Sequence, residues 1–341
     1  MSSVEAKPAL EPAPAGEPPP VERLRQPLSH YLEAYAFVGL LVVAALFFSF
    51  WSETADTFPT GTNWQTLVSG NAVVAIIAIA ALFPLVCYEF DLSVGAIAGL
   101  SAVFSASAMA SGTPVIVGIG VGVGIGVGVG LINALLITRV GVNAVITTLG
   151  TSIVIVGVIN QKTSGTAVTG NIPASLTEFG TGSTLGIPRP AWALAVVALL
   201  AWYVLAYTPY GRYLYAYGSN RSAAKLVGLR TRLLLGLTFV ISGALSGAAG
   251  VLLVARAGVA DPRVGDTLTL PALAAAFLSA AAIKPGRYNV GGVLVAIFFL
   301  AVLNSGLALA GAESYVTSYV NGIALICGVA LSVRLGGRKE T

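Results

Sequence analysis

Ten long apolar segments constrain this chain more than any other feature of its sequence. A helix that crosses about 30 Å of hydrocarbon needs about 20 apolar residues, and roughly 17 suffice at the short end. The segments that reach or approach this length are 35–51, 67–87, 92–110, 114–137, 143–160, 190–207, 235–256, 269–283, 289–311 and 318–333. Only 9% of the residues are charged, whereas an ordinary soluble domain carries about 25%. The sequence therefore predicts an all-α membrane protein, a polytopic bundle of about ten transmembrane helices.

The distribution of positive charge gives the predicted orientation. Loops that face the cytoplasm are enriched in Lys and Arg. If the chain starts inside and crosses ten times, fourteen of its eighteen basic residues are cytoplasmic: Lys7, Arg23, Arg25, Arg139, Arg212, Arg221, Lys225, Arg230, Arg232, Lys284, Arg287, Arg334, Arg338 and Lys339. The remaining four lie outside: Lys162, Arg189, Arg256 and Arg263. A wrong span count would remove this asymmetry, so both termini are predicted to be cytoplasmic.

The two ends of the chain lack apolar segments. The first 27 residues contain seven prolines and no hydrophobic run of the kind found in a secretory signal. This composition is typical of disorder. We therefore expect a disordered, proline-rich cytoplasmic tail over 1–30, a transmembrane domain over 31–335 and a short basic cytoplasmic tail over 336–341.

The span 114–137 contains the run GIGVGVGIGVGVG, which has the period of a strand but far more than a strand's length. As a helix, it carries glycines four residues apart on one face: Gly118, Gly122, Gly126 and Gly130. A second face, about 200° away, carries three more: Gly120, Gly124 and Gly128. Two smooth faces allow close helix contact on both sides, so this helix is expected inside the bundle. The spacing excludes the GxGxxG dinucleotide motif.

Between the second and third spans, Pro84, Glu89 and Asp91 introduce polar residues and a helix breaker. One interpretation is a broken or re-entrant segment that is enclosed by protein near a solute pathway, because irregular backbone at membrane depth must line a cavity or be enclosed. The other is a tight cytoplasmic turn in which Asp91 caps the next helix. From the sequence alone, the second is the more ordinary arrangement.

Uncharged polar residues occur in several spans: Asn71, Asn133, Asn143, Thr147, Thr148, Asn160, Gln161 and Asn304. Each could face an aqueous pathway, or could hydrogen-bond a neighbouring helix for about 1 kcal/mol. No span contains an acidic residue paired with Lys, Arg or His at mid-depth. Ion-coupled carriers usually bury such groups, so a self-powered secondary transporter is disfavoured.

Other function classes lack the residues that they require. His30 is the only histidine, no Cys/His/carboxylate cluster provides a catalytic or metal site, and no GxxxxGK[ST] motif is present to bind ATP phosphates. Cys87 and Cys327 are expected to be small core residues. The net charge of +4 reports topology rather than nucleic-acid binding. An enzyme is therefore not expected, and nucleotide chemistry would have to come from a partner.

The loop 208–234 contains five basic residues and no acidic one. Orientation alone explains the charge but not the pattern, because Ser219 or Asn220 can cap a short helix that Gly228 ends. One broad side of this helix carries Ala223, Leu226 and Val227, and the other carries Arg221 and Lys225. A short amphipathic helix of this kind is typical of a docking element that lies at the interface or enters a groove on a soluble partner.

The motif GRYLYAYGSNRSAAKLVGL (211–229), followed by SGALSGAAGVLLVAR (242–256), resembles the ribose/xylose-type simple-sugar permease subunits of bacterial ABC importers. The segments FDLSVGAIAGLSAV (90–103) and VGVNAVITTLGTSIVIVGV (140–158) resemble spans of the same family. The similarity extends over about residues 35–335.

This resemblance implies a permease in the bacterial inner membrane that acts as a homodimer or pseudo-dimer around a central pathway. It implies two cytoplasmic ATPase subunits, which bind ATP and Mg, and an extracytoplasmic sugar-binding protein. The chain itself is expected to bind no cofactor and no metal. Motif matches place the ATPase-coupling helix at Gly218, Ser219, Asn220, Ala223, Ala224, Lys225, Leu226 and Gly228, and the broken segment near the pathway at Asp91, Ser93 and Gly95. The predicted pathway also includes Asn71, Asn143, Thr147 and Asn304.

The chain departs from the family pattern around the eighth span. Pro271 replaces a frequent acidic residue, and Lys284-Pro285 lies where paired glycines are usual. A second cytoplasmic contact and a typical pentose substrate are therefore less firmly implied. The alternatives are a branched-chain amino-acid type ABC permease, an ATP-independent channel or facilitator, and a scaffold subunit that does not conduct.

Overall fold

The computed structural model describes residues 28–337, and helices make up most of this part of the chain. In chain order its elements are α1 (Leu28–Phe50), α2 (Gly61–Val86), α3 (Val94–Ala110), α4 (Val115–Leu135) with the π-turn η1 (Leu136–Val140), α5 (Ala144–Thr163), α6 (Ala174–Thr181), β1 (Ser183–Thr184), β2 (Ile187–Pro188), α7 (Arg189–Tyr207), α8 (Pro209–Ser219), α9 (Arg221–Leu226), α10 (Thr231–Ala257), α11 (Val264–Leu278) with the 3₁₀ turn η2 (Ser279–Ala281), α12 (Val290–Leu309) and α13 (Ser314–Gly337). The predicted tails lie largely outside the described residues, although α1 begins at Leu28.

The predicted all-α membrane fold is confirmed. Within the described residues, seven helices are long and apolar enough to cross a membrane, namely α2, α4 with η1, α5, α7, α10, α11 with η2, and α12. Three shorter apolar helices cover Tyr35–Phe50, Val94–Ala110 and Ser314–Ala330. Each of the ten predicted segments thus coincides with an apolar helix. The helix α11 begins at Val264, earlier than predicted, and continues through Pro271.

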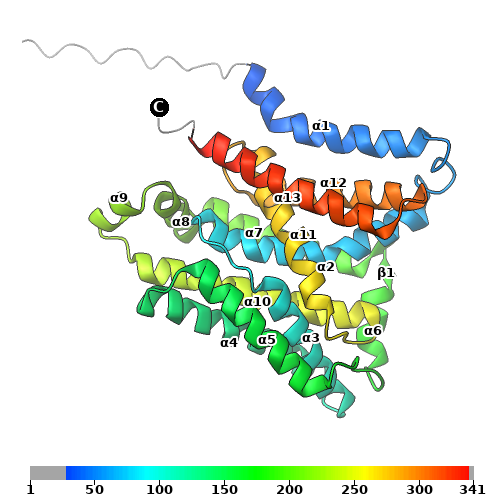
Figure 1. Ribbon diagram of the computed structural model, residues 1–341. Coiled ribbons are helices and arrows are strands. Elements are labelled where there is room, and N and C mark those ends of the chain that lie inside the picture. The colour runs from blue at the N-terminus through cyan, green and yellow to red at the C-terminus, as the bar shows by residue number, and fades with distance from the viewer. Residues whose placement is uncertain (1–27, 338–341) are drawn as a thin grey trace, which may run out of the picture.

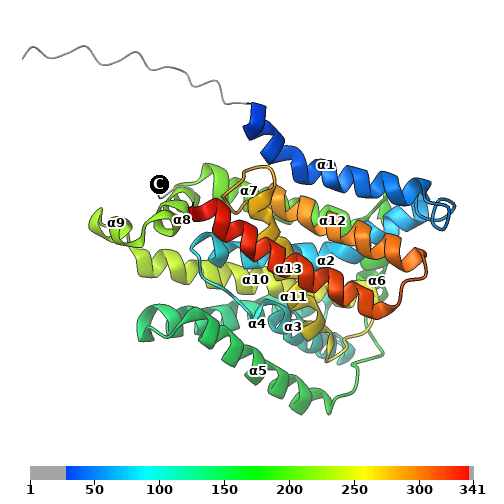
Figure 2. The same ribbon diagram turned by 45° about the horizontal axis from the view of Figure 1, so that its top comes forward.

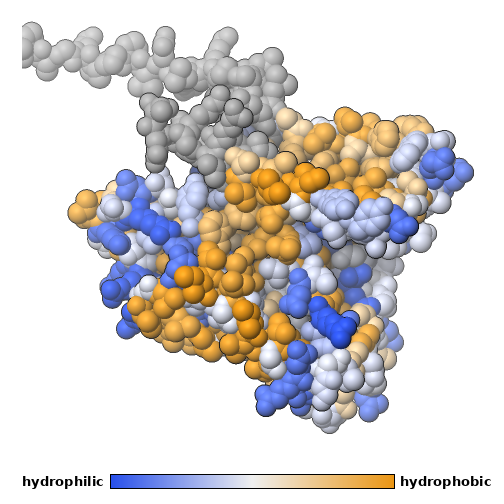
Figure 3. All heavy atoms as spheres, in the orientation of Figure 1, coloured by the Kyte–Doolittle hydropathy of each residue, from blue (hydrophilic) through white to orange (hydrophobic). Residues whose placement is uncertain are grey.

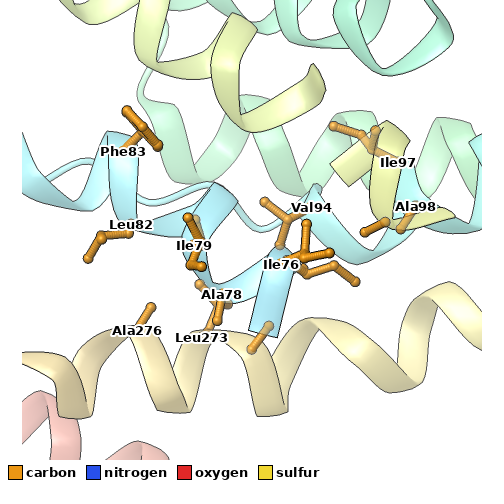
Figure 4. Packing of buried hydrophobic residues seen from close by; sticks show 14 of the residues in the cluster. Ile76, Ala78, Ile79, Leu82, Phe83, Val94, Ile97, Ala98, Leu273 and Ala276 are labelled. Atoms are coloured by element: carbon orange, nitrogen blue, oxygen red, sulfur yellow. The ribbon is translucent and has the colours of Figure 1, made fainter. Parts of the chain in front are cut away.

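Helices α2, α3 and α10 form the centre of the bundle, and 13 of the 17 residues of α3 are buried. About two thirds of the most apolar part of α2 is buried (67%), and the corresponding value for α10 is 61%, whereas α4, α5 and α7 each reach 28%. Figure 1 shows α2 and α10 between the other helices, with α11 crossing them obliquely. In Figure 4, Leu273 and Ala276 of α11 point towards Ala78 and Leu82 of α2. These contacts matter because packing, rather than water exclusion, holds helices together in lipid.

The glycine-rich helix α4 packs through one of its two glycine faces. Gly118, Gly122, Gly126 and Gly130 are buried, and a Cβ at Gly126 would overlap the backbone of Gly243 on α10. The other face was predicted to pack as well, and this prediction is wrong. Its glycines have no neighbouring atom within 4 Å of a Cβ: Gly120, Gly124 and Gly128. The helix therefore lies at the edge of the bundle, and Figure 2 shows it between α10 and α5.

Several short elements were not predicted. The connection between α5 and α7 contains α6 and a two-residue antiparallel pairing in which Ser183 lies opposite Pro188. The loop 208–234 contains two helices, α8 and α9, rather than one. Figure 1 places the β1 hairpin and α9 at opposite ends of the bundle. We refer to these as the hairpin end and the α9 end.

Candidate functional site

Helix α9 is a short exposed helix with defined ends. The Asn220 side chain accepts a hydrogen bond from the Ala223 amide at 2.8 Å, so Asn220, not Ser219, is the N-cap. Ser219 is the last residue of α8. Gly228 has a φ of +81°, a conformation that favours glycine at the end of a helix. Leu226 is 87% exposed and its neighbour Val227 is 75% exposed, so an apolar tip projects from the α9 end.

The preceding helix α8 anchors α9 to the bundle. It is N-capped by Thr208, whose hydroxyl accepts from the Gly211 amide. Two tyrosines donate hydrogen bonds to other elements, Tyr210 to the Leu234 carbonyl at 3.2 Å and Tyr215 to the Tyr288 carbonyl at 2.7 Å. Burial raises the pKa of Tyr210, so its hydroxyl remains a donor at neutral pH. These hydrogen bonds attach α8, the element directly before α9, to α10 and to the loop that precedes α12.

Arg221, the first residue of α9, connects this helix to the segment that follows α2. Its Nη2 atom lies 2.8 Å from Glu89 Oε1 and donates a hydrogen bond of 2.8 Å to the Cys87 carbonyl. The guanidinium also lies 5.5 Å from the centre of the Tyr217 ring. Within residues 35–330, this is the one ion pair between side chains. It joins the exposed tip of the molecule to the chain that enters the bundle.

The segment 87–93 is irregular and ends deep in the protein. Tyr88 has a φ of +55°, which reverses the chain after α2. Asp91 is only 1% exposed. Its Oδ1 accepts hydrogen bonds from the Ser93 amide at 3.0 Å and the Ser93 hydroxyl at 2.6 Å, and its Oδ2 accepts from the Ser242 hydroxyl at 2.8 Å. Hydroxyl and amide donors thus compensate the buried carboxylate, which also lies near the positive N-terminus of α3.

The hydrogen bonds continue from Asp91 into two further helices. The Asn133 amide of α4 donates to the Ser93 hydroxyl at 3.0 Å, and the Thr151 hydroxyl of α5 donates to the Asn133 carbonyl oxygen at 2.7 Å. The Leu92 amide donates to the Thr148 hydroxyl at 3.0 Å. This polar network therefore joins α3, α4, α5 and α10 to segment 87–93. We call it the Asp91 network.

The Asp91 network lies inside the helix bundle rather than at its surface, because Asp91, Ser93 and Ser242 are all buried. Ser242 is eleven residues from the start of α10, which corresponds to roughly 16 Å along the helix axis. Segment 87–93 thus begins with an exposed turn, since Tyr88 is 45% exposed, and ends inside the bundle at Asp91. It combines the tight turn of one interpretation with the buried, broken backbone of the other. Asp91 nevertheless caps locally, since it accepts the amide of Ser93, the N-cap residue of α3.

The other predicted pathway residues do not converge on one chamber. Gly95 lies against the Gly265 backbone of α11. Asn143 is exposed and caps α5, and Thr147 is buried one turn further on. Asn71 donates to the Leu67 carbonyl of its own helix. Asn304 of α12 lies 3.5 Å from Asn321 of α13, and its Oδ1 has no hydrogen-bond partner within the described residues.

The predicted coupling residues divide between the surface and the interior. The exposed members are Ser219, Asn220, Ala223, Lys225, Leu226 and Gly228. Ala224 is buried, and Gly218 lies against the Val86 carbonyl at the end of α2. The structure adds Arg221, Glu89, Thr151 and Ser242 to the site. Arg221 and Glu89 were visible as charges, but hydroxyls such as Ser242 cannot be distinguished in sequence from those that bond only their own helix.

In the described part of the chain, no three His, Cys, Asp or Glu side chains are grouped so that they could hold a metal ion. The contacts described above are hydrogen bonds and the Arg221–Glu89 ion pair.

Comparison with known proteins identifies the family. A family model described as "Branched-chain amino acid transport system / permease component" matches residues 66–329. The chain belongs to this permease family. The permease is 30% identical over 311 residues to the ribose import permease of Haemophilus influenzae, covering 90% of this chain and 95% of the relative. It is 33% identical over 296 residues to the ribose import permease of Bacillus subtilis, covering 86% and 91%.

Further relatives extend the comparison to other solutes. The D-allose transport system permease protein of Escherichia coli is 29% identical over 296 residues, covering 86% of this permease and 90% of the relative. No solved structure gives a significant match. The resemblance to simple-sugar ABC permeases is thus confirmed, and these relatives favour it over the branched-chain amino-acid alternative.

Proposed function

We propose that the chain is the membrane subunit of an ABC importer that moves a small polar solute inward, using ATP hydrolysed by a partner subunit. The family match supports the permease role. The relatives named for ribose and D-allose support a monosaccharide as the solute. The chain has no P-loop motif, so ATP and Mg would be bound by the ATPase and not by this chain.

The observation that carries the mechanism is the contact between Arg221 and Glu89. An ATPase subunit would bind the exposed tip of α9, where Leu226 and Val227 supply an apolar surface. Closure of the ATPase pair would displace α9. Arg221 would then pull segment 87–93, and the Asp91 network would pass this movement to α3, α4, α5 and α10.

In this proposal the pathway residues have two roles. Asp91 and Ser93 are buried and act as positioning residues that hold the moving helices together. Gly95 allows the close approach of α3 and α11. Asn143, Thr147, Asn71 and Asn304 remain the candidates for contact with the solute, and the unpartnered Oδ1 of Asn304 is the clearest of these.

The orientation and partners follow from the same geometry. Arg212, Arg221, Lys225 and Lys284 lie at the α9 end, so this end is proposed to face the cytoplasm, with both termini inside a bacterial inner membrane. An extracytoplasmic solute-binding protein would dock at the hairpin end. A second copy of the permease would complete the pathway.

Reconstitution into proteoliposomes tests the proposal. With its partner ATPase, binding protein and internal ATP, the permease should take up radiolabelled ribose, allose or arabinose, with leucine as the comparison. Val227→Glu, which places a charge on the α9 tip, should abolish ATPase binding and uptake, whereas Leu185→Glu at the hairpin end should retain ATPase binding. Uptake that needs neither ATP nor ATPase would instead identify a facilitator, and uptake of leucine alone would contradict the sugar assignment.

A further inference from the structure

A groove opens at the α9 end between α4 with η1 and the start of α10. Its volume is about 1020 Å³, at the upper limit of the range of about 300–1,000 Å³ that is usual for small-molecule sites. It lies beside α9 but is separate from the Asp91 network, and its two long walls belong to membrane helices. Lys225 of α9 and Tyr217 also line the groove, but the proposed transport mechanism gives no role to Arg139, Arg230 or Arg232.

Four cationic side chains surround the groove: Arg139, Lys225, Arg230 and Arg232. All four are exposed, and among side chains 35–330 no acidic group lies within 4 Å of any of them. Because like charges repel, such a group of cations from three elements favours the binding of an anion between them.

The N-terminus of α10 also favours a negatively charged ligand in this groove. Arg230 occupies its N-cap without making a side-chain cap, and the first turn contains no acidic residue. The free amides of a helix N-terminus carry a partial positive charge, so arginines are disfavoured there and anions are favoured. The charge, the free amides and the groove thus all indicate a negatively charged ligand.

The walls of the groove carry apolar side chains that are partly exposed at the surface of the protein. Leu131 and Leu135 of α4 are each 49% exposed, and Leu233 of α10 is 56% exposed. Figure 3 shows hydrophilic residues at the α9 end next to an apolar surface. A free anion would gain nothing from these leucines, whereas an amphiphile would satisfy the cations and cover the walls.

We propose that this groove binds the phosphate headgroup of an anionic phospholipid, whose acyl chains lie along α4 and α10. Arg139 and Arg232 contact the phosphate from opposite walls, and Leu131, Leu135 and Leu233 pack against the upper part of the chains. The inference requires only that the chain spans a membrane, and it is independent of which solute the permease moves.

Native mass spectrometry of the full-length permease in neutral detergent tests this site. Phosphatidylglycerol should bind in preference to phosphatidylcholine. Arg139→Gln combined with Arg232→Gln should weaken phosphatidylglycerol binding about 10- to 30-fold, since each surface cation contributes about 1 kcal/mol. Lysine at both positions should restore most of the binding. The matched control, Arg212→Gln with Lys284→Gln, removes two charges at the same end outside the groove and should leave binding unchanged.

Other outcomes would overturn the proposal. An equal loss in the control variant would show that binding follows net charge only. Competition by millimolar glycerol phosphate would show a soluble-anion site in which the leucine walls play no part. If the glutamine variant kept phosphatidylglycerol but lost its ATPase or changed its oligomeric state, the groove would be a protein interface. An unchanged melting temperature checks that each variant is folded.

Discussion

A buried carboxylate such as that of Asp91 is tolerated only when enough donors surround it. Three hydrogen bonds reach Asp91, from the Ser93 amide, the Ser93 hydroxyl and the Ser242 hydroxyl. The residue therefore acts as a junction between helices, and its removal leaves three donors without a partner.

Asp91→Ala should destabilise the protein by about 2–4 kcal/mol, because several buried donors would lose their acceptor. Ser101→Ala is the matched control, since the Ser101 hydroxyl is buried and has no hydrogen-bond partner within the described residues. Its removal should have little effect or stabilise. Unfolding in mixed micelles measures both, and equal losses would contradict the role of Asp91.

The reactivity of Cys87, the first residue of segment 87–93, measures how accessible this segment is. Burial raises the pKa of its thiol from an ordinary 9.0 to about 12, while the nearby Arg221 guanidinium opposes this shift. In a Cys327→Ser variant, maleimide labelling at pH 7–9 should therefore be slow and rise about tenfold per pH unit without a plateau, because only the thiolate reacts. Above pH 9 the unfolded thiol ionises and the folded one does not, so its contribution to stability is lost as the pH rises from 9 towards 12. A plateau near pH 9 would show an accessible thiol.

At the scale of elements, the molecule combines fixed contacts with one adjustable contact. The α4–α10 interface is fixed because two helix backbones touch at Gly126 and Gly243. The α9–segment 87–93 contact is adjustable because it depends on partly exposed side chains, with 45% of Arg221 and 16% of Glu89 accessible. Such a pair contributes only about 1 kcal/mol or less, so a partner can displace it.

Gly126→Ala should separate α4 from α10 and lower the melting temperature, since a Cβ there would overlap the Gly243 backbone. Gly124→Ala is the control on the exposed face, where no atom lies within 4 Å of the added Cβ. It should be neutral or stabilise by up to about 1 kcal/mol through helix propensity. Equal effects of the two changes would contradict the observed packing.

Charge changes at Arg221 and Glu89 test the adjustable contact. Arg221→Gln or Glu89→Gln should lower ATP-driven uptake about two- to fivefold while ATP hydrolysis continues, because about 1 kcal/mol of contact is lost. The exchanged pair, Glu89→Arg with Arg221→Glu, should recover part of the uptake, and Arg212→Gln should behave as the unmodified protein. If either single change released the ATPase in a pull-down, these residues would bind the partner directly.

At the scale of the whole molecule, the two ends differ in chemistry. The α9 end carries the basic groove and the exposed tip of α9, and the hairpin end carries α6 with β1 and β2. Transport by such a subunit requires that the two ends face different compartments. The ATPase would bind one of the two ends. Helix movement would then be transmitted from that end towards the other.

Cysteine labelling tests the orientation. In a background without Cys87 and Cys327, Leu185→Cys at the hairpin end should react with an impermeant maleimide in intact cells, because Leu185 is 88% exposed. Val227→Cys on the α9 tip, 75% exposed, should react only after lysis. The reverse pattern would invert the proposed topology.

Local sequence determined the positions of the membrane helices, because the need for an unbroken apolar segment is a property of consecutive residues. It also located the stop at Gly228 and limited the cap to Ser219 or Asn220, since both are local backbone features, and the structure then showed that Asn220 is the cap. The short helix α9 was therefore found within a few residues of its true ends.

Only the tertiary structure decided which polar residues act together. The packing of one α4 glycine face, the contact of Arg221 with Glu89 and the meeting of Asp91 with Ser242 join residues far apart in the chain. In a sequence that is apolar throughout, no alternation of polar and apolar faces shows which side of a helix meets a neighbour, because lipid and protein interior are equally apolar. That choice depends on the shape of the neighbouring helices, which the local sequence does not contain.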